Sequence, residues 1–486
     1  MILRENGLWV EAVETTSEER EALRRALTFS TRDEDVCLLV SRGSVPAFLR
    51  GLWEPLFRRN PLIPPPLPAT PAPPVEAPQG QLTGVTLRWY QQEAVEACLQ
   101  WGRGIIYLPT GTGKTEIMLE LFRRLGCRCL VVVATIGQMK QMAQRARDRG
   151  FESVGMWGGG KRRGLATAPV VVAIAASLVN GLVGGSAAEL QDIGCLVFDE
   201  VHHLGTAETW YAIADGMGWI ARRYGFSATP LRNRDAWSNP WDVVTQGYTG
   251  EVIYSRTREE LAEFCPDCQA YMLRPHLLQR DVPGWDWTRL YRECVVDADD
   301  RNAFLALLIE AICAWGGRPL VLVQQVRHGK EMLRRLMGRV SAWMIMGSET
   351  LLALTPRGVV EIAGGCRRAA QALADGDCKC LIGTTAIHEA IDVPGATDIV
   401  IAGAGRAPLS VPQRIGRGMR GEKLQLRIWD IWDAAHPVLA NQAQERRDLY
   451  ERYGVPVSSA PLGPSALATV AAVQRWVGSG GFGLGD

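Results

Sequence analysis

The stretch LPTGTGKTE, which starts at Leu108, has the residue types and spacing of a phosphate-binding loop. Gly111 and Gly113 would let the backbone curl so that its N–H groups point at phosphate oxygens, beside the positive end of a following helix. Lys114 would then reach the β and γ phosphates of a nucleotide, and Thr115 would ligate Mg²⁺. The full pattern has glycine at position 108, so a plain glycine-rich turn is the alternative.

A pair of acidic residues follows an apolar run in CLVFDEVHH, at positions 195–203. Asp199 would hold the hydration shell of Mg²⁺, and Glu200 would orient and deprotonate an attacking water. A solvated strand end can carry the same pair, so the pair alone is weak evidence. Its place between the phosphate loop and FSATP at 226–230 makes the catalytic interpretation strong.

Three arginines recur at a spacing of three residues in QRIGRGMR: Arg414, Arg417 and Arg420. If this octet is a helix, the three permanent cations lie within about a third of its circumference and would face an anion. The alternative is a solvated basic helix. Such a helix would favour lysine and would not need Gly416 and Gly418.

These residues need a scaffold that brings distant motifs together, and the chain predicts one. From about residue 85 onward, short β-branched runs alternate with helical stretches; the runs are GIIYLP, CLVVVAT, VVVAIAAS, CLVFDE, FSATP, PLVLVQQ, CLIGTT, DIVIAGAG and LRIWDIWD. This rhythm predicts parallel sheets with crossover helices. The predicted strands are more than a single sheet usually holds, so we expect two α/β domains that meet between residues 245 and 300.

A proline-rich run at 61–78 holds 9 of the 27 prolines and predicts an extended polyproline spacer. Before it, LWVEAVE alternates like a strand, Thr16 and Glu19 form a capping box for the helix EEREALRRAL, and VCLLV is typical of another strand. We therefore expect a small α/β N-terminal module. The predicted division is a module at 1–60, a linker at 61–84, α/β domains at 85–255 and 256–450, and a tail at 451–486.

Composition excludes several classes of protein. The 486 residues hold 53 Lys plus Arg against 52 Asp plus Glu, so any nucleic-acid surface must be local. The N-terminus turns acidic before an apolar signal core could form, and the chain has no clean apolar stretch of about 18 residues. The 12 cysteines are scattered through strand-like runs. Together these features predict a soluble, intracellular protein with buried thiols.

Several motifs, taken in order, resemble those of superfamily 2 helicases of the DExH class over residues 85–450. PTGTGKT is similar to motif I, DEVHH to motif II, SATP to motif III, TTAIHEAIDVP to motif V and QRIGRGMR to motif VI. LRWYQQEAV resembles the adenine-contacting segment. Within the superfamily, VGMWGGGKRRG, the RN pair at 301–302, IWDIWD and RRDLYERYG look like UvsW-type bacteriophage helicases and the XPB-like group.

This resemblance implies two RecA-like domains in tandem after a small DNA-binding module, with ATP and Mg²⁺ bound between the domains. The implied nucleotide and catalytic residues are Tyr90, Gln91, Gly111, Thr112, Gly113, Lys114, Thr115, Asp199, Glu200, Asp392, Gln413, Arg417 and Arg420. Tyr90 would stack on the base and Gln91 would read its edge. Asp392 would meet the ribose or motif VI, and Gln413 the γ-phosphate or the attacking water.

The resemblance also implies how the arginines act. Arg417 and Arg420 would reach the γ-phosphate when the cleft between the domains closes, which couples closure to hydrolysis; such arginines contribute about 10³ to 10⁵ in rate in other NTPases. Arg414 would pack or pair structurally. Ala390 stands where the family usually has glycine, and its small side chain fits the same pattern.

Nucleic-acid contacts are predicted in both domains. The resemblance suggests Thr135 in the first domain and Thr384 in the second. The hairpin residues Lys161, Arg162 and Arg163 would touch DNA phosphates or, equally, face solvent. Ile174 stands where a DNA-contacting threonine is common, and Ala134 stands where proline is usual, so the DNA contacts of the first domain depart from the family pattern.

Three further features have plain alternatives. CPDC at 265–268 has zinc-knuckle spacing, but a second cysteine pair with suitable spacing is missing, so we expect a turn with two thiols and no structural metal. His202 and His203 are expected to link the ATP cleft to motif III or VI. Trp53 and Phe57 would stack on a base or, in the favoured interpretation, pack onto their own module.

The predicted function is an ATP-dependent DNA helicase or translocase that acts on forked or branched DNA in replication, recombination or repair. The expected partner is single-stranded, duplex or forked DNA, and the expected state is a monomer in the cytoplasm of a bacterial cell or a bacteriophage-infected host. An RNA helicase, the motor of a restriction system and a nucleotide-gated DNA clamp without processive unwinding are the alternatives.

Overall fold

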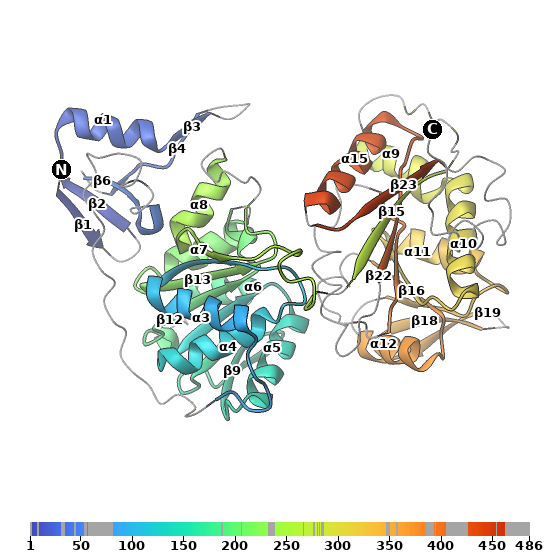
Figure 1. Ribbon diagram of the computed structural model, residues 1–486, viewed down its shortest axis with the longest axis horizontal. Coiled ribbons are helices and arrows are strands. Elements are labelled where there is room, and N and C mark those ends of the chain that lie inside the picture. Colours follow the sequence, from blue (N-terminus) through green and yellow to red (C-terminus); the bar gives the residue numbers. More distant parts are fainter. Residues whose placement is uncertain are drawn as a thin grey trace. The chain divides into compact units, whose positions relative to one another are not determined.

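A computed structural model of the chain has two units (Figure 1). The first comprises Met1–Pro109 and Gly113–Arg256, and the second comprises Thr257–Asp486, with which Thr110–Thr112 are grouped. The structure describes residues 2–6, 9–30, 35–42, 45–52, 56, 81–185, 188–205, 207–231, 239–265, 267–275, 278, 280, 282, 286–346, 350–355, 358–384, 393, 395–404, 426–452 and 454–461. Both units are built on a central sheet that separates layers of helices.

The N-terminal module is a small sheet with one long helix. Within the described residues its sheet has the order β1-β2-β6-β5, with neighbours antiparallel. The bounds are β1 Ile2–Asn6, β2 Trp9–Glu14, α1 Ser17–Ala26, β3 Thr28–Ser30, β4 Asp35–Cys37, β5 Val40–Arg42 and β6 Val45–Leu49. The predicted capping box is confirmed, because Thr16 Oγ1 accepts from Glu19 N at 3.2 Å and Glu19 Oε2 accepts from Thr16 N at 2.8 Å. The expected strand VCLLV is divided between β4 and β5.

The first RecA-like sheet has the order β10-β9-β11-β8-β12-β13-β7-β14 among the described residues. Its pairings are parallel except for the β9–β10 hairpin. The strands are β7 Arg103–Tyr107, β8 Cys129–Val133, β9 Val154–Gly158, β10 Lys161–Arg163, β11 Val170–Ile174, β12 Cys195–Asp199, β13 Arg222–Ser227 and β14 Val252–Ser255. Their aliphatic runs are buried on both faces, as helix-covered parallel strands require.

Helices cover both faces of this sheet. They are α3 Trp89–Trp101, α4 Lys114–Leu125, α5 Ile136–Asp148, α6 Ala175–Val183, α7 Glu208–Gly216 and α8 Pro240–Thr249. Residues of α6, α7 and α8 share one hydrophobic core with the sheet, and Figure 1 shows α3, α4 and α5 on the opposite face. Because parallel strands end at one edge, the segments after β7, β8, β11, β12 and β13 meet there, where α/β proteins bind ligands.

The second sheet has the order β19-β18-β17-β20-β16-β21-β22-β15-β23 in the described part of the chain. Its strands are β15 Cys268–Arg274, β16 Pro319–Val323, β17 Ala342–Ile345, β18 Thr350–Thr355, β19 Gly358–Ala363, β20 Cys380–Thr384, β21 Asp398–Ile401, β22 Leu426–Ile431 and β23 Val457–Pro461. The hairpins β17–β18 and β18–β19 are antiparallel, and the other pairings are parallel.

The helices of the second unit again form two layers. They are α9 Trp287–Tyr291, α10 Asp299–Ala314, α11 Val326–Arg335, α12 Cys366–Asp375 and α15 Pro437–Arg452. One hydrophobic core joins α10 and α11 to the sheet, and a separate core joins it to α15. The predicted fold class, two RecA-like α/β domains in tandem after a small α/β module, is confirmed by this architecture.

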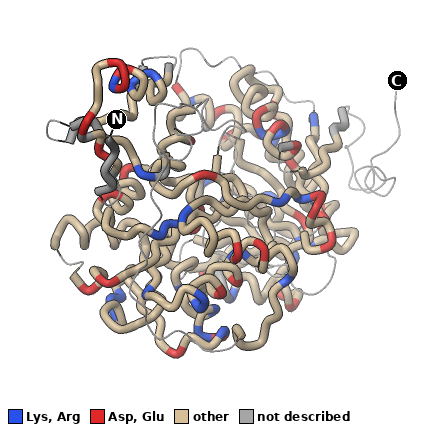
Figure 2. The backbone as a smooth tube through the Cα atoms, turned by 60° about the vertical axis from the view of Figure 1, so that its left-hand side comes forward, with Lys and Arg blue, Asp and Glu red and all other residues tan. Residues whose placement is uncertain are grey.

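Charge and thiols are distributed as the composition suggests. Figure 2 shows basic and acidic residues interspersed along the described backbone. In the same residues the cysteines are free, and all except Cys37 are buried. Cys265 and Cys268 are both buried, and burial raises the pKa of the Cys268 thiol to about 11. No helix among the residues described could span a bilayer, and no cluster of three or more metal-binding side chains occurs in them.

Candidate active site and nucleic-acid interface

The phosphate loop lies between β7 and α4, with both of its glycines in the left-handed region. Gly111 has φ 84° and Gly113 has φ 77°. A side chain at Gly113 would also collide with its surroundings, because an added Cβ would lie 2.5 Å from Nε2 of Gln91. Glycine is therefore required at position 113 for both its conformation and its space.

Lys114 points back into this loop. Its Nζ donates hydrogen bonds to the carbonyl oxygens of Leu108, at 3.1 Å, and Pro109, at 3.3 Å, and the residue is only 9% exposed. Leu108 itself is fully buried, and its N–H donates to the carbonyl oxygen of Ser227 at 3.3 Å. The leucine that departs from the eight-residue pattern is thus a core residue, while its carbonyl oxygen holds the lysine of the loop.

The segment that resembles an adenine-contacting motif, residues 87–95, leads into α3 and forms its first two turns. Gln91 is buried, its Oε1 accepts from the N–H of Arg88 at 2.9 Å, and its Nε2 lies beside Gly113. Tyr90 is fully buried, and its Oη accepts from Nη1 of Arg88 at 3.1 Å. Because the ring of Tyr90 is enclosed by protein, this structure offers no open face for the predicted stacking. The exposed ring is that of Trp89, at 46% exposure.

Arg149 joins the phosphate-loop helix to the chain that leads into α3. Its Nε and Nη2 donate to the carboxylate of Glu116 at 2.8 and 3.0 Å, and its Nη1 donates to the carbonyl oxygen of Thr83 at 3.1 Å. The hydrogen bonds and charge of Glu116 raise the pKa of Arg149. No local pattern in the sequence marks Arg149, because its partners are distant in sequence.

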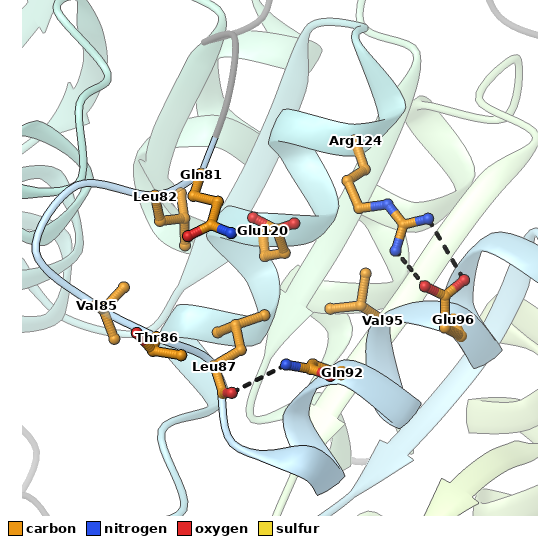
Figure 3. A pocket seen from close by; sticks show the side chains of 10 residues that line it. All are labelled: Gln81, Leu82, Val85, Thr86, Leu87, Gln92, Val95, Glu96, Glu120 and Arg124. Atoms are coloured by element: carbon orange, nitrogen blue, oxygen red, sulfur yellow. Dashed lines mark hydrogen bonds and ion pairs between the residues drawn. The ribbon is translucent and has the colours of Figure 1, made fainter.

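A pocket of about 260 Å³ lies beside the adenine-contacting segment, between residues 81–87, α3 and α4 (Figure 3). Gln92 crosses one side and donates to the carbonyl oxygen of Leu87 at 3.1 Å. The ion pair between Glu96 and Arg124 joins α3 to α4 at the other side. The pocket was not predicted, since no residue type or spacing in these segments marks it.

The acidic pair lies at the carboxyl end of β12, two strands from β7 in the sheet order and so about 10 Å across the sheet. Asp199 is the last residue of the strand and is half-buried. Glu200 has φ 67°, the one positive φ of a non-glycine residue in the described part of the chain. Such a conformation costs about 1 to 3 kcal/mol and persists where surrounding contacts determine it.

Those contacts come from the SATP segment at the end of β13. The N–H of Glu200 donates to the carbonyl oxygen of Phe226 at 2.8 Å. The hydroxyl of Ser227 donates to Oε2 of Glu200 at 3.2 Å and accepts from the N–H of Thr229 at 3.0 Å. Since Ser227 also accepts from Leu108 through its carbonyl oxygen, one serine connects the acidic pair to the phosphate loop.

His202 completes this arrangement. Its Nδ1 lies 3.1 Å from Oγ of Ser227 and 3.5 Å from Oε2 of Glu200. The rings of His202 and His203 are 4.4 Å apart, and the ring of His203 is 4.8 Å from that of Trp210. The contact of His202 with Ser227 agrees with the predicted link to motif III, whereas the ring of His203 packs beside His202 and Trp210.

Thr135 begins α5, directly after β8. Its Oγ1 accepts from the N–H of Gln138 at 3.3 Å, and Oε1 of Gln138 accepts from the N–H of Thr135 at 3.1 Å, so the threonine is part of a capping box. The next residue, Ile136, is 46% exposed. A Cβ added at Gly159 would lie 3.0 Å from Cδ1 of Ile136, which places the turn of the β9–β10 hairpin against the start of α5.

The basic residues of this hairpin are all exposed but not equivalent. Arg162 forms an ion pair with Glu189 at 2.7 Å, and its guanidinium lies 4.8 Å from the centre of the Trp157 ring. Alternation along the strand places Lys161 and Arg163 on the opposite face. Arg162 therefore has an acidic partner of its own, whereas the other two cations share a different face.

Ile174 has a packing role at the base of the same hairpin. The residue is 7% exposed, and a Cβ at Gly158 would lie 2.5 Å from Cδ1 of Ile174. Isoleucine at this position thus fills the space that the glycine leaves open. The departure from the family pattern is explained by this packing.

Thr384 ends β20 beside β16, where it pairs in register with Val323. The chain after β16 enters α11, where the N-cap residue Gln325 and the helical residues Arg327 and Lys330 are exposed. Arg327 is paired with Asp297 at 2.7 Å. This polar turn was not among the predicted nucleic-acid contacts. The polar residues QQVR, which directly follow the apolar run PLVLV, could have indicated it.

The predicted residues of motifs V and VI, Asp392, Gln413, Arg414, Arg417 and Arg420, lie outside the described residues. Their flanking strands, β21 and β22, are adjacent and parallel.

The subgroup motifs of the second unit form a buried ion network. Arg301 is fully buried; its Nε donates to Asp433 at 2.5 Å and its Nη1 to the carbonyl oxygen of Ala402 at 2.7 Å. Nε of Arg446 donates to Asp430 at 2.8 Å. The RN, IWDIWD and RRDLYERYG motifs are therefore parts of one structural core.

Comparisons with known proteins agree with these motifs. Residues 84–232 match the family model described as "Type III restriction enzyme, res subunit", and residues 364–422 match "Helicase conserved C-terminal domain". The chain is 25% identical over 373 residues to the "DNA 3'-5' translocase XPB2" of Sulfurisphaera tokodaii, covering 71% of this chain and 81% of that protein. It is 25% identical over 369 residues to the "ATP-dependent DNA helicase uvsW" of Enterobacteria phage T4, covering 71% and 68%.

A solved structure of S. cerevisiae Dbp5, bound to RNA and ADP BeF3, has a TM-score of 0.54 at 15% identity and covers 80% of this chain and 93% of that one. This likeness shows the fold alone. The family models and both relatives agree with the order of the motifs, and together they support a superfamily 2 helicase of the UvsW and XPB type.

Proposed function

We propose that this chain is an ATP-dependent DNA helicase or translocase of the DExH class. The observation that carries the proposal is the fixed conformation of Glu200, which Ser227 holds at the same sheet edge as the phosphate loop. A buried carboxylate kept in a left-handed conformation suits a base that must meet a water in one orientation. The relatives named a DNA translocase and a DNA helicase support the same activity.

The residues at this edge fit ATP and Mg²⁺. The loop from Gly111 to Lys114 has the backbone conformation and the cation that a polyphosphate requires, and Thr115 and Asp199 would hold the metal. Bound Mg²⁺ would neutralise charge on the β and γ phosphates. Glu200 orients and deprotonates the water, and His202 keeps the hydroxyl of Ser227 directed at that carboxylate.

Arg417 and Arg420 supply the remaining charge in this proposal. They reach the γ-phosphate when the cleft between the domains closes, with Gln413 beside the water and Asp392 near the ribose. Each closure then couples hydrolysis to a movement along the nucleic acid.

The nucleic-acid backbone is proposed to contact the carboxyl edges of both sheets. In the first unit the contacts are the start of α5 at Thr135 and the hairpin cations Lys161 and Arg163, with Arg162 contributing less because Glu189 neutralises it. In the second unit they are Thr384 and the exposed first turn of α11. Contacts to phosphates imply little sequence specificity and a steep salt dependence.

The proposed substrate is forked or branched DNA, in replication, recombination or repair. We place the protein in the cytoplasm of a bacterial cell or a bacteriophage-infected host and propose that it acts as a monomer. An RNA helicase is the second candidate, because the fold is shared with Dbp5 bound to RNA. The relatives named for DNA favour the first candidate.

The deciding experiment measures ATP hydrolysis without nucleic acid and with single-stranded DNA, duplex DNA, a forked junction or structured RNA, each at two salt concentrations. We expect stimulation by DNA, greatest for the fork and weakened by salt. Stimulation by RNA alone would transfer the proposal to the RNA helicase. Hydrolysis that no polymer stimulates would overturn both.

A further inference from the structure

Between Arg256 and Thr257 the chain leaves the first unit for the main body of the second. On one side, the N–H of Arg256 donates to the carbonyl oxygen of Tyr107 at 3.3 Å, directly after β14. On the other side, Thr257 and Glu260 cap a turn reciprocally, at 2.6 and 3.3 Å. Arg256 and Thr257 are therefore each held by contacts on their own side of the link between them.

Arg256 is held by its side chain as well. Nη2 of Arg256 donates to Oε2 of Glu93 at 2.8 Å, and Oη of Tyr254 donates to the same oxygen at 2.7 Å. The guanidinium lies 4.8 Å from the centre of the Tyr254 ring and 5.7 Å from that of Trp89. We call these four residues, Trp89, Glu93, Tyr254 and Arg256, the α3–β14 clamp.

The clamp joins the end of the first unit to the elements that would bind the nucleotide. Trp89 and Glu93 belong to α3, whose first turn carries Gln91 against Gly113 of the phosphate loop. Tyr107 is the last residue of β7, the strand that enters that loop. A shift of α3 or of the loop therefore acts directly on the residue at which the chain leaves the first unit.

We propose that Arg256 is a positioning residue that transmits movement between the nucleotide site and the second unit, with the Arg256–Thr257 link as the hinge. This inference rests on the proposed ATP-driven motor. The clamp fixes the direction in which the backbone leaves the first unit at Arg256. Nucleotide-dependent movement at α3 and β7 is therefore transmitted to the second unit, which a flexible connection would not do. Arg256 does not touch the reacting atoms, and its loss leaves the phosphate loop and Glu200 complete.

The same helix offers a matched control. Glu96, one turn beyond Glu93, is paired with Arg124 of α4 (Figure 3). The Glu96 and Arg124 side chains are 61% and 36% exposed, against 48% and 30% for Glu93 and Arg256. The two pairs thus have the same chemistry and similar exposure, but the control pair has no connection to the end of the first unit.

The experiment compares Arg256→Ala with Arg124→Ala in the full-length chain, by steady-state ATP hydrolysis with and without forked DNA and by thermal unfolding. For Arg256→Ala we expect a fall of about three- to tenfold in the DNA-stimulated kcat, since an exposed ion pair and an exposed cation–π contact are each weak. The KM for ATP, the hydrolysis without DNA and the thermal midpoint should stay near those of the parent. Arg124→Ala should leave all four quantities unchanged.

A charge reversal, Glu93→Arg combined with Arg256→Glu, should recover part of the stimulated kcat that either single reversal loses. The proposal is overturned if Arg256→Ala keeps the full stimulated kcat, if it lowers stimulated and unstimulated hydrolysis equally, or if Arg124→Ala has the same effect. A parent protein that DNA does not stimulate would refute the proposed function itself, which separates that failure from failure of the clamp.

Discussion

At the scale of single residues, backbone conformation determines which side chains the site tolerates. Gly113 and Glu200 both have positive φ, but for different reasons. Gly113 has a conformation and a space that exclude a side chain, whereas Glu200 carries a large side chain in a strained conformation held by Ser227. Glycine at 113 is a steric requirement of the loop. The strained conformation of Glu200 supports a role in which its carboxylate must have one orientation, as in the proposed general base.

We expect Gly113→Ala to abolish most ATP hydrolysis and to lower stability by roughly 1 to 3 kcal/mol, because its Cβ would press on Nε2 of Gln91 in a left-handed backbone. Gly160→Ala is the control, since Gly160 has φ 75° but nothing within 4 Å of the added Cβ. Chemical denaturation and ATPase rates check both variants. Equal losses of hydrolysis in the two would contradict the role given to Gln91.

Glu200→Gln should reduce kcat for ATP hydrolysis by about 10² to 10⁴, the usual contribution of a general base, with ATP still bound. Ser227→Ala should have a smaller effect in the same direction, because it removes one hydrogen bond to the carboxylate but not the carboxylate itself. Rates and nucleotide affinities measured side by side test both. Unchanged DNA-stimulated hydrolysis in Glu200→Gln would show that the assigned base is wrong.

At the scale of elements, the ends of helices and hairpins carry the residues that are proposed to contact phosphates. The β9–β10 hairpin lies against the start of α5, and its glycines fit around Ile136 and Ile174. In this hairpin Arg162 lies next to Trp157 and Glu189. The hairpin therefore carries one cation neutralised by an acidic partner, Arg162, beside two other cations, Lys161 and Arg163.

The hairpin predicts unequal effects on DNA binding. Arg163→Ala should weaken binding and reduce the slope of log affinity against log salt by about 1, as for the loss of one phosphate contact. Arg162→Ala should change the slope less, because its charge already meets Glu189. Titrations of fluorescent DNA at several salt concentrations give both slopes. A larger change for Arg162 would reverse the assignment.

A buried histidine in α11 makes the second unit sensitive to acid. Burial, and then the charge of Arg301, lower the pKa of His328 to about 3, with Glu331 opposing them; Nε2 lies 2.9 Å from Oδ1 of Asn302. The folded state thus disfavours the proton. The contribution of His328 to the free energy of unfolding is fully present above its ordinary pKa of 6.5 and is lost as the pH drops toward 3.

Between pH 7.5 and pH 5, this one group should cost about 2 kcal/mol of stability. His328→Gln keeps a hydrogen-bond donor toward Asn302 and should remove that part of the pH dependence. Denaturant titrations at several pH values measure it. An unchanged pH profile in the variant would show that other groups cause the loss.

At the scale of the whole molecule, two units have separate cores and separate ion networks. The first unit holds Gly113 and Lys114 of the phosphate loop and the acidic pair. The second is held by buried pairs such as Arg301 with Asp433 and Arg446 with Asp430, which tie α10 and α15 to β22 and the segment after it. Unfolding of such a chain need not be a single transition.

Asp433→Asn should destabilise the second unit by about 3 to 5 kcal/mol, because it leaves the fully buried Arg301 without its counter-charge. The first unit should keep its stability. Calorimetry assigns each transition, since Gly113→Ala should shift the transition of the first unit instead. Arg162→Ala, which breaks an exposed pair, should shift no transition by more than about 1 kcal/mol. A shift of both transitions by Asp433→Asn would mean that the units unfold together.

Features that depend on neighbouring residues could be predicted from the amino-acid sequence. The phosphate loop, the acidic pair, the capping box at Thr16 and the rhythm of strands and helices are local patterns of spacing, so the fold class and the candidate nucleotide site could be predicted from them. The order of the motifs along the chain indicates the family without any knowledge of tertiary contacts.

The tertiary structure alone decided which side chains are enclosed and which meet. Trp89 and Tyr90 are adjacent aromatic residues, yet the ring of Tyr90 is fully buried and that of Trp89 is exposed. Arg162 finds Glu189, and Arg256 finds Glu93, across long separations. No local pattern encodes such pairs, because burial and partnership depend on how distant segments pack, and that is why the clamp at the end of the first unit could only be seen in the folded chain.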